Sequence, residues 1–341
     1  MTAARRALAV VGLGVAALLL PALVPLYYLI LLSSALALAI ACLALNLLLG
    51  TSGLVPFGQA AYFGLGAYAG GFLYTLLDVE ALEAYLLAGM VAAGGTAAIF
   101  GALCVRATHV HFTIMTLAVA QIVHSVFISG IVFRAAGGVG RGLFLLGGGG
   151  LYIPRLPIGG HLPTPEAFPI VMFYVVTAAF AVCAWLLHRL TCSPFGLALR
   201  AISGNPTRAE LVGIRVRRYR WAAFVISGTV TGLAGGLTGL LDRQVTPEQL
   251  HWVFSAKLVL ATVLGGIGYF WGPAVGAVAL VTLQETALRT TDYWSFALGA
   301  LLILVTALAP GGLAGLAAGL LRRPGAGERP WDRPGPPGKH G

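Results

Sequence analysis

The chain has 341 residues, of which 58% are hydrophobic and only 9% are charged, and its net charge is +10. Soluble domains carry roughly 25% charged residues, and a soluble fold of this size needs more polar surface to face water. The composition therefore excludes an ordinary soluble protein. A membrane β-barrel would alternate apolar and polar residues, whereas the apolar stretches here are continuous and rich in Leu and Ala. The sequence predicts an all-α membrane protein, a polytopic bundle of transmembrane helices.

Stretches of about 20 mainly apolar residues, the length of a spanning helix, recur along the whole chain. We expect about ten spans, at residues 7–24, 27–49, 54–77, 84–106, 110–133, 168–190, 221–241, 253–270, 273–289 and 293–309. The first could instead be a signal peptide, since two arginines precede its apolar core. It lacks a small-x-small cleavage site before polar sequence, and Pro25 and another apolar stretch follow it directly. We therefore expect the first span to be retained.

Charge predicts the orientation in the membrane. Cytoplasmic loops carry an excess of Lys and Arg, and residues 189–220 hold seven arginines against a single acidic residue, Glu210. Arginines also precede the first span, follow the fourth and follow the last. Ten spans place all of them on one side, so both termini are expected in the cytoplasm. Because the arginines lie at span ends, we read them as orientation signals that face membrane lipid, and we expect no nucleic-acid partner.

The same topology predicts the domain organisation. Residues 1–321 form one transmembrane domain, with a cytoplasmic loop at 189–220 and a Gly-rich external loop at 134–167. Residues 322–341 are rich in Pro, Gly and charge. Such a segment cannot bury a core, so we expect a disordered cytoplasmic tail.

Sequence motifs for catalysis are lacking in this chain. It has no GxxxxGK[ST] phosphate-binding loop, no HExxH zinc motif and no GxSxG nucleophile elbow. Its four cysteines show no metal-ligand spacing. Paired carboxylates at mid-membrane, which proton- or sodium-coupled carriers often need, are also lacking. We therefore expect no catalytic residue, metal site or cofactor here, and a separate chain would have to drive any active transport.

A few polar side chains lie within the apolar spans. Gln59, Gln121 and His124 are candidates for lining a solute pathway, because polar groups in lipid usually mark function. His124 could instead be a packing histidine whose hydrogen bonds are satisfied. Glu285 precedes Arg289 by one helical turn, which predicts an ion pair at the end of a span.

Glycines recur at a spacing of four residues and in two clusters. Such stripes let helix backbones approach closely, either in static packing within the chain or in a subunit interface or moving seam. Residues 50–60 and 264–276 can also interrupt helices, and broken helix is tolerated only where it is buried or lines a cavity. A solute pathway and a plain turn both fit these two stretches. The packing or hinge candidates are Gly228, Gly232, Gly236, Gly265, Gly266, Gly268, Gly272 and Pro273.

The basic loop 189–220 contains residues that typically begin and end short helices. Ser193-Pro194 opens a short amphipathic helix at 195–202, and Asn205-Pro206 ends it. Thr207 can cap a second helix at 208–212, which stops at Gly213. Two short helices around a turn form a surface that a cytoplasmic partner can bind, whereas a loop that binds lipid headgroups would not need these helix start and stop signals.

Several segments resemble the branched-chain amino acid ABC importer permeases of the LivM/LivH group. They are the loop and span at 193–237 with NPTRAELVGI, the block VLGGIGYFWGPAVGA at 263–277, and LNLLLGTSGLVPFGQAAYFGLGAYAGG at 45–71. The run FTIMTLAVAQIVHS, at 112–125, is closer to the LivM type. Together these segments fall within residues 42–285, and the loop and the glycine–proline block are the more specific ones.

The resemblance implies a permease subunit, not an enzyme, of a heteromeric importer in the bacterial cytoplasmic (inner) membrane. It implies four kinds of partner: two cytoplasmic ATPases that bind ATP and Mg²⁺, a second, LivH-type permease, an extracytoplasmic substrate-binding protein, and membrane lipid. It places the ATPase-coupling element in the loop. The residues at its positions are Asn205, Arg208, Ala209, Glu210, Leu211, Gly213 and Ile214.

The chain departs from the family pattern at two places, where Pro206-Thr207-Arg208 replaces a more acidic stretch and AAGGVGRGL stands at 135–143. Branched-chain or related hydrophobic amino acids are the substrate that the resemblance implies. Urea or short amides, which related permeases carry, are an alternative within the family. An ATP-independent secondary carrier or channel and an integral-membrane enzyme are the alternatives outside it.

Overall fold

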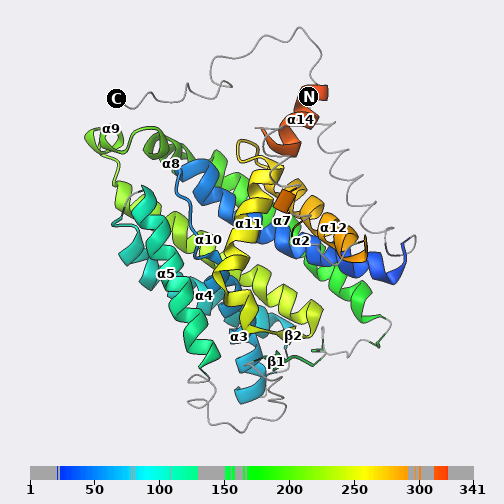
Figure 1. The fold of residues 1–341 in the computed structure, drawn as a ribbon. Coiled ribbons are helices and arrows are strands. Elements are labelled where there is room, and N and C mark those ends of the chain that lie inside the picture. The colour runs from blue at the N-terminus through cyan, green and yellow to red at the C-terminus, as the bar shows by residue number, and fades with distance from the viewer. Residues whose placement is uncertain are drawn as a thin grey trace.

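The computed structural model describes residues 21, 24–77, 79, 81–107, 109–129, 150–154, 156–157, 164–165, 167–290, 296, 299–300 and 311–321. They form a helical bundle (Figure 1). Its helices are α2 (Leu26–Asn46), the π-helix η1 (Leu47–Thr51), α3 (Gln59–Leu77), α4 (Leu82–Cys104), α5 (His109–Ile128), α7 (Phe168–Cys192), α8 (Pro194–Gly204), α9 (Pro206–Leu211), α10 (Val216–Asp242), the 3₁₀ helix η2 (Pro247–Leu250), α11 (Trp252–Gly265), α12 (Gly272–Thr290) and α14 (Gly312–Leu321). Strand β1 (Leu151–Tyr152) pairs antiparallel with β2 (Gln244–Val245).

Five segments among the described residues are long and apolar enough to cross a membrane. They are Leu26–Thr51, Leu82–Cys104, Val110–Ile128, Phe168–Cys192 and Val216–Asp242. Each coincides with a predicted span, so the all-α, multi-pass class is confirmed. Most of the predicted spans 7–24 and 293–309, the whole tail 322–341 and most of loop 134–167 lie outside the described residues. The count of ten and the side of the termini therefore stay predictions.

Helices α2, α3 and α10 lie at the centre of the bundle. α10 packs mainly against α4, α3 and α2, and its contacts are close because small residues face each other. A methyl group added to Gly66 of α3 would overlap the backbone of Gly232 in α10. Aromatic rings fill the space beside these glycines, and Phe224 stands edge-on to Tyr62 and to Phe112, with ring centroids 5.5 and 5.8 Å apart. Close backbone contact of this kind stabilises the association of helices in lipid, where the hydrophobic effect contributes little.

The helices are interrupted at both glycine-rich stretches. α2 widens into η1, and residues 53–58 then run without helix before α3 begins at Gln59. α11 ends at Gly265, Gly266 takes a positive φ of 108°, and α12 begins at Gly272. The predicted spans 54–77 and 253–270 are thus shorter as helices than expected. Glycine removes the Cβ that would exclude such a backbone.

Candidate functional site

Helices α8 and α9 lie at one end of the bundle, opposite the β1–β2 pair (Figure 1). The segment between the long helices is 193–215, because α7 continues to Cys192 and α10 already begins at Val216. The predicted loop 189–220 thus includes the last turn of α7 and the first turn of α10. Arginines have good helix propensity, and their long stems let the charges reach the membrane surface from the ends of spanning helices.

A small apolar cluster holds α8 and α9 to the bundle. Ile202 of α8, Ala209 of α9 and Val216 of α10 are buried together. Phe195 at the start of α8 stacks on Tyr219 of α10, with ring centroids 5.5 Å apart. The two short helices are thus packed parts of the fold, and their outward residues have defined positions.

The caps of α9 differ in part from the sequence prediction. Asn205, not Thr207, caps the helix: its side-chain oxygen accepts a hydrogen bond from the Arg208 N–H at 3.0 Å. Pro206 occupies the first helical position, where its fixed φ suits a helix start. This moves the start of the helix two residues before the predicted one. At the other end Gly213 takes a φ of 88°.

Gly213 and the residue after it complete a Schellman motif. The Gly213 N–H donates to the Glu210 carbonyl at 2.9 Å, and the Ile214 N–H donates to the Ala209 carbonyl at 3.0 Å. The motif satisfies the last carbonyls of the helix and reverses the chain. Of the seven predicted coupling residues, Ala209 is buried and Ile214 is partly exposed. The other five are exposed, and they are Asn205, Arg208, Glu210, Leu211 and Gly213.

The exposed tip of α8–α9 is apolar as well as basic. Leu211 and Val212 are 83% and 82% exposed, and Leu197 on α8 is 60% exposed. Exposed arginines flank them, including Arg208 and Arg215. Singly exposed apolar residues are common on proteins, but three large ones on one pair of packed helices, two of them adjacent in sequence, are of the kind that a protein partner covers.

The pathway candidates do not converge on one site. Gln59 is buried at 1% exposure, and its Nε2 donates to Ser227 Oγ at 3.0 Å. Ser227 donates in turn to the Ala44 carbonyl at 2.7 Å, so this chain of hydrogen bonds joins α3, α10 and α2. The Gln59 Oε1 atom has no hydrogen-bond partner among the described residues. His124 is half-buried, with its ring centroid 4.8 Å from that of His251.

Gln121 instead belongs to the outward face of α5. This face is mixed: the small or polar residues His111, Ala118, Gln121, Ser125 and Ser129 are exposed, and so are the large apolar residues Ile114, Met115 and Ile122. The corresponding face of α4 is apolar after the exposed Glu83 in its first turn, with Leu87, Val91, Gly95, Ile99 and Leu103 exposed. The serines were missed at the sequence level, although their spacing of four residues on a helix that holds Gln121 was a usable signal.

The packing candidates on α10 face other helices of the same chain. A methyl group on Gly228 would lie 2.6 Å from Ala97 Cβ of α4, and one on Gly236 would lie 3.4 Å from Leu86 of the same helix. A methyl group on Gly232 would lie 2.3 Å from Ala93 Cβ and would overlap it as well. This stripe therefore packs within the chain.

The second glycine cluster forms the turn between α11 and α12. A side chain at Gly265 or Gly272 would overlap backbone of the facing helix, and Pro273 is buried beside them. Gly266 carries the positive φ. Gly268 differs, since no described residue outside its neighbours comes within 4 Å of where its Cβ would lie. Its freedom follows from its place at the exposed tip of the turn.

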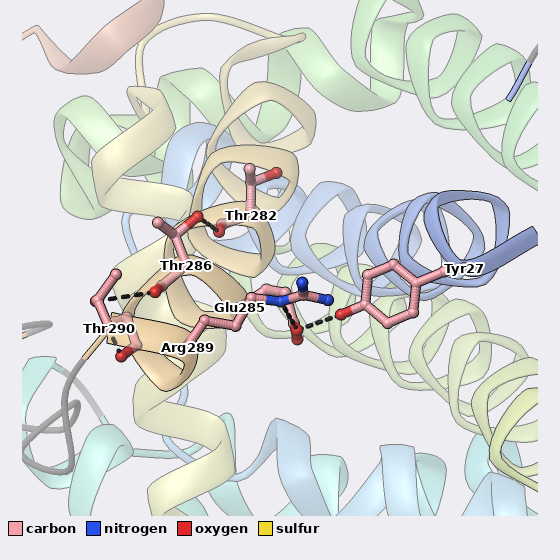
Figure 2. A network of polar contacts seen from close by, with 7 residues as sticks. Tyr27, Thr282, Glu285, Thr286, Arg289 and Thr290 are labelled. Carbon is pink, nitrogen blue, oxygen red and sulfur yellow. Dashed lines mark hydrogen bonds and ion pairs between the residues drawn. The ribbon is translucent and has the colours of Figure 1, made fainter. Parts of the chain in front are cut away.

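The predicted ion pair at the end of α12 is confirmed and has a third member. Arg289 Nε lies 3.0 Å from Glu285 Oε1. Figure 2 shows that Tyr27, at the start of α2, donates its hydroxyl to the same carboxylate oxygen. The Arg289 guanidinium also stands 4.6 Å from the centre of the Tyr27 ring. In the part of the chain that the structure describes, no three His, Cys, Asp or Glu side chains gather as metal ligands would.

Comparison with known proteins gives a family. Residues 27–306 match the family described as the permease component of branched-chain amino acid transport systems. The chain is 26% identical over 286 residues to the high-affinity branched-chain amino acid transport system permease protein LivM of Escherichia coli K12, which covers 80% of this chain and 66% of LivM. It is 33% identical over 125 residues to LivH of Salmonella typhimurium, covering 36% of this chain and 40% of LivH.

A third relative is named for another solute. The autoinducer 2 import system permease protein LsrC of Klebsiella pneumoniae is 29% identical over 177 residues, or 49% of this chain and 50% of LsrC. The match to LivM falls just short of two thirds of that protein's length, at 66%. No solved structure matches the chain. Because the family match extends over most of its length, the chain belongs to the permease components of branched-chain amino acid transport systems.

Proposed function

We propose that this chain is one of two permease subunits of an ATP-driven importer, and that a cytoplasmic ATPase binds the tip of α8 and α9. The observation that carries the proposal is the exposed patch of Leu197, Leu211 and Val212 on two short helices that are themselves packed firmly against the bundle. In a chain of this family, a fixed apolar patch at the basic end of the bundle is best explained by a partner protein in the cytoplasm.

The composition of the patch supports a protein partner over a lipid surface. Large exposed apolar residues at the centre with arginines at the edge resemble a protein interface, which has an apolar core and a polar rim. The Schellman motif at Gly213 and the buried Ala209 hold Leu211 and Val212 outward. A partner that grips them could move α9 as one body, which coupling to ATP hydrolysis requires. In this proposal ATP and Mg²⁺ are bound by the partner, and this chain holds no cofactor.

The solute pathway is proposed to follow the outward face of α5. An amide that faces hydrocarbon without a partner costs several kcal/mol, so the exposed Gln121 and the serines near it favour water or a polar protein surface. A second permease of the LivH type, packed across this face, would enclose such a pathway. The buried Gln59 and half-buried His124 would then lie outside this pathway and stabilise the packing of α3 and α5.

The proposed solutes are branched-chain or related hydrophobic amino acids, delivered by an extracytoplasmic binding protein to a bacterial cytoplasmic membrane. LivM is named for these amino acids, and the similarity to it extends over 80% of this chain. LsrC is named for a different solute and is similar over a shorter stretch. The similarity to LivM thus favours amino acids over other solutes of related importers.

The test is reconstitution in liposomes with the ATPases, the second permease and the binding protein encoded beside this chain. Uptake of leucine should require ATP, and uptake by the isolated chain without ATP would identify a secondary carrier or channel instead. Leu211→Asp should weaken co-purification of the ATPases by about tenfold or more, as a charge does at the centre of an apolar interface. The control is Gln244→Asp, an exposed position at the opposite end of the bundle, which should leave co-purification unchanged.

A further inference from the structure

The break between α2 and α3, residues 47–58, lies between the docking helix α8 and the helix α5. Its first half is the π-helix η1 and its second half is the non-helical segment 53–58. We propose that this break transmits the movement of α8 to α5, entering at the contact of Ser203 with Gly53 and leaving through Thr113 and Thr116. The inference rests on the proposed function and names the route by which ATPase movement reaches the proposed pathway.

The first contact joins α8 to the break. Ser203 is the last residue but one of α8, and its Oγ lies 2.7 Å from the position that a Cβ on Gly53 would take. Gly53 has a φ of 69°, a conformation that favours glycine. Leu199 and Ile202 of α8 are fully buried beside it. Gly53 and Ser203 are themselves exposed, but they are in direct contact, so a shift of α8 along this contact would displace Gly53.

The second contact joins the break to α5. Thr113 Oγ1 donates to the Val55 carbonyl at 2.8 Å, and the Phe57 N–H donates to Thr116 Oγ1 at 3.2 Å. A methyl group on Gly58 would lie 2.5 Å from the Thr116 carbonyl, so the two backbones are in direct contact. Two hydrogen bonds and this contact tie the non-helical segment to one face of α5. The opposite face of that helix carries Gln121 and Ser125.

The element between the two contacts departs from α-helical geometry. In η1 the turn is wider than in an α-helix, and Leu54 N–H reaches back to the Leu48 carbonyl at 3.1 Å. The hydroxyls of Thr51 and Ser52 also bond back to the carbonyls of Leu47 and Leu48. π-Helical turns are rare and often lie at functional sites. Returning one residue to α-helical register would move the segment by about 1.5 Å along the axis, which is a discrete step of the kind that coupling needs.

Two experiments on the reconstituted importer test the route. The first uses Gly53→Cys with Ser203→Cys, in a background where exposed Cys192 is replaced by Ser. A Cβ on Gly53 would lie 3.5 Å from Ser203 Cβ, within the range of a disulfide. If α8 and the break move together, the oxidised importer keeps ATP-driven uptake close to that of the reduced one. Loss of uptake on oxidation, with the ATPases still bound, would overturn the inference.

The second experiment cuts the route at α5. Thr116→Val and Thr113→Val each remove a hydroxyl that holds the break. Each should lower uptake by about tenfold, within the range of known coupling between sites, while ATPase association and hydrolysis stay near wild type. The control is Thr96→Val, since the Thr96 hydroxyl bonds only to carbonyls of its own helix. Uptake by the α5 variants at the level of the control would refute the route. Failure of the proposed function is distinct, because the unmodified importer would then show no ATP-driven uptake.

Discussion

Where two helices touch through glycine, adding even one methyl group is expected to lower the stability of the protein. Gly228 of α10 faces Ala97 of α4, and a methyl group on Gly228 would lie 2.6 Å from Ala97 Cβ. Carbon atoms pack best at about 3.5–4.0 Å, so Gly228→Ala creates an overlap of about 1 Å. Ala97 is fully buried and its methyl group cannot rotate away. The helices must therefore separate.

We expect Gly228→Ala to destabilise the purified protein by about 1–3 kcal/mol, the usual cost of one extra methyl in a packed core. The assay is the midpoint of thermal unfolding in detergent. The matched control is Gly95→Ala on the outward face of α4, where no described residue lies within 4 Å of the added methyl. It should be neutral or stabilising, by up to about 1 kcal/mol from helix propensity.

A compensating change makes the test specific. Ala97→Gly removes the atom that the new methyl would strike, so the double variant should recover most of the lost stability. Two neighbours that share one contact are expected to be non-additive in this way. Equal midpoints for Gly228→Ala and Gly95→Ala, or no recovery in the double variant, would refute the close packing of α10 on α4.

Three further changes have expected outcomes. Asn205→Ala should destabilise α9 by about 1 kcal/mol, seen as faster amide exchange there, whereas Thr207→Ala should leave exchange unchanged. Glu285→Gln should shift the unfolding midpoint little, because exposed ion pairs contribute about 0–1 kcal/mol; a large shift would show that the link to Tyr27 holds α2 to α12. Gln121→Leu should lower uptake by the assembled importer, but leave its unfolding midpoint unchanged, since the side chain is exposed within this chain. Unchanged uptake would remove Gln121 from the pathway.

Local patterns in the sequence were sufficient to predict most of the long helices. Residues 26–51, 82–104 and 168–192 are continuous apolar runs, and no soluble structure or barrel would use them. The stop at Gly213 was also predictable, because few other residues adopt its positive φ. The ion pair of Glu285 with Arg289 was predictable because the two residues are four apart on one helix.

Features that depend on distant residues were not predictable. Tyr27 and Glu285 are 258 residues apart in the chain, and Gln59 and Ser227 are 168 apart. The choice between Asn205 and Thr207 as helix cap was a local one that the sequence prediction missed, since both residue types cap helices well. It is decided by Pro206, which fits the first helical position directly after Asn205. The wide turn of η1 has no local signature in its sequence.

The two kinds of contact in this fold differ in how they respond to movement. Between α3, α10 and α4 the backbones touch through glycines, and added atoms would overlap. Sliding these helices past one another would bring larger residues into that space, so they are expected to behave as one rigid body. The segment 53–58 has one such backbone contact with α5, at Gly58, but it is otherwise held to α5 by two side-chain hydrogen bonds. Such bonds can break and form with new partners at a net cost of about 1 kcal/mol each. Movement driven from α8 would therefore be taken up along the break and α5, while the glycine-packed centre stays fixed.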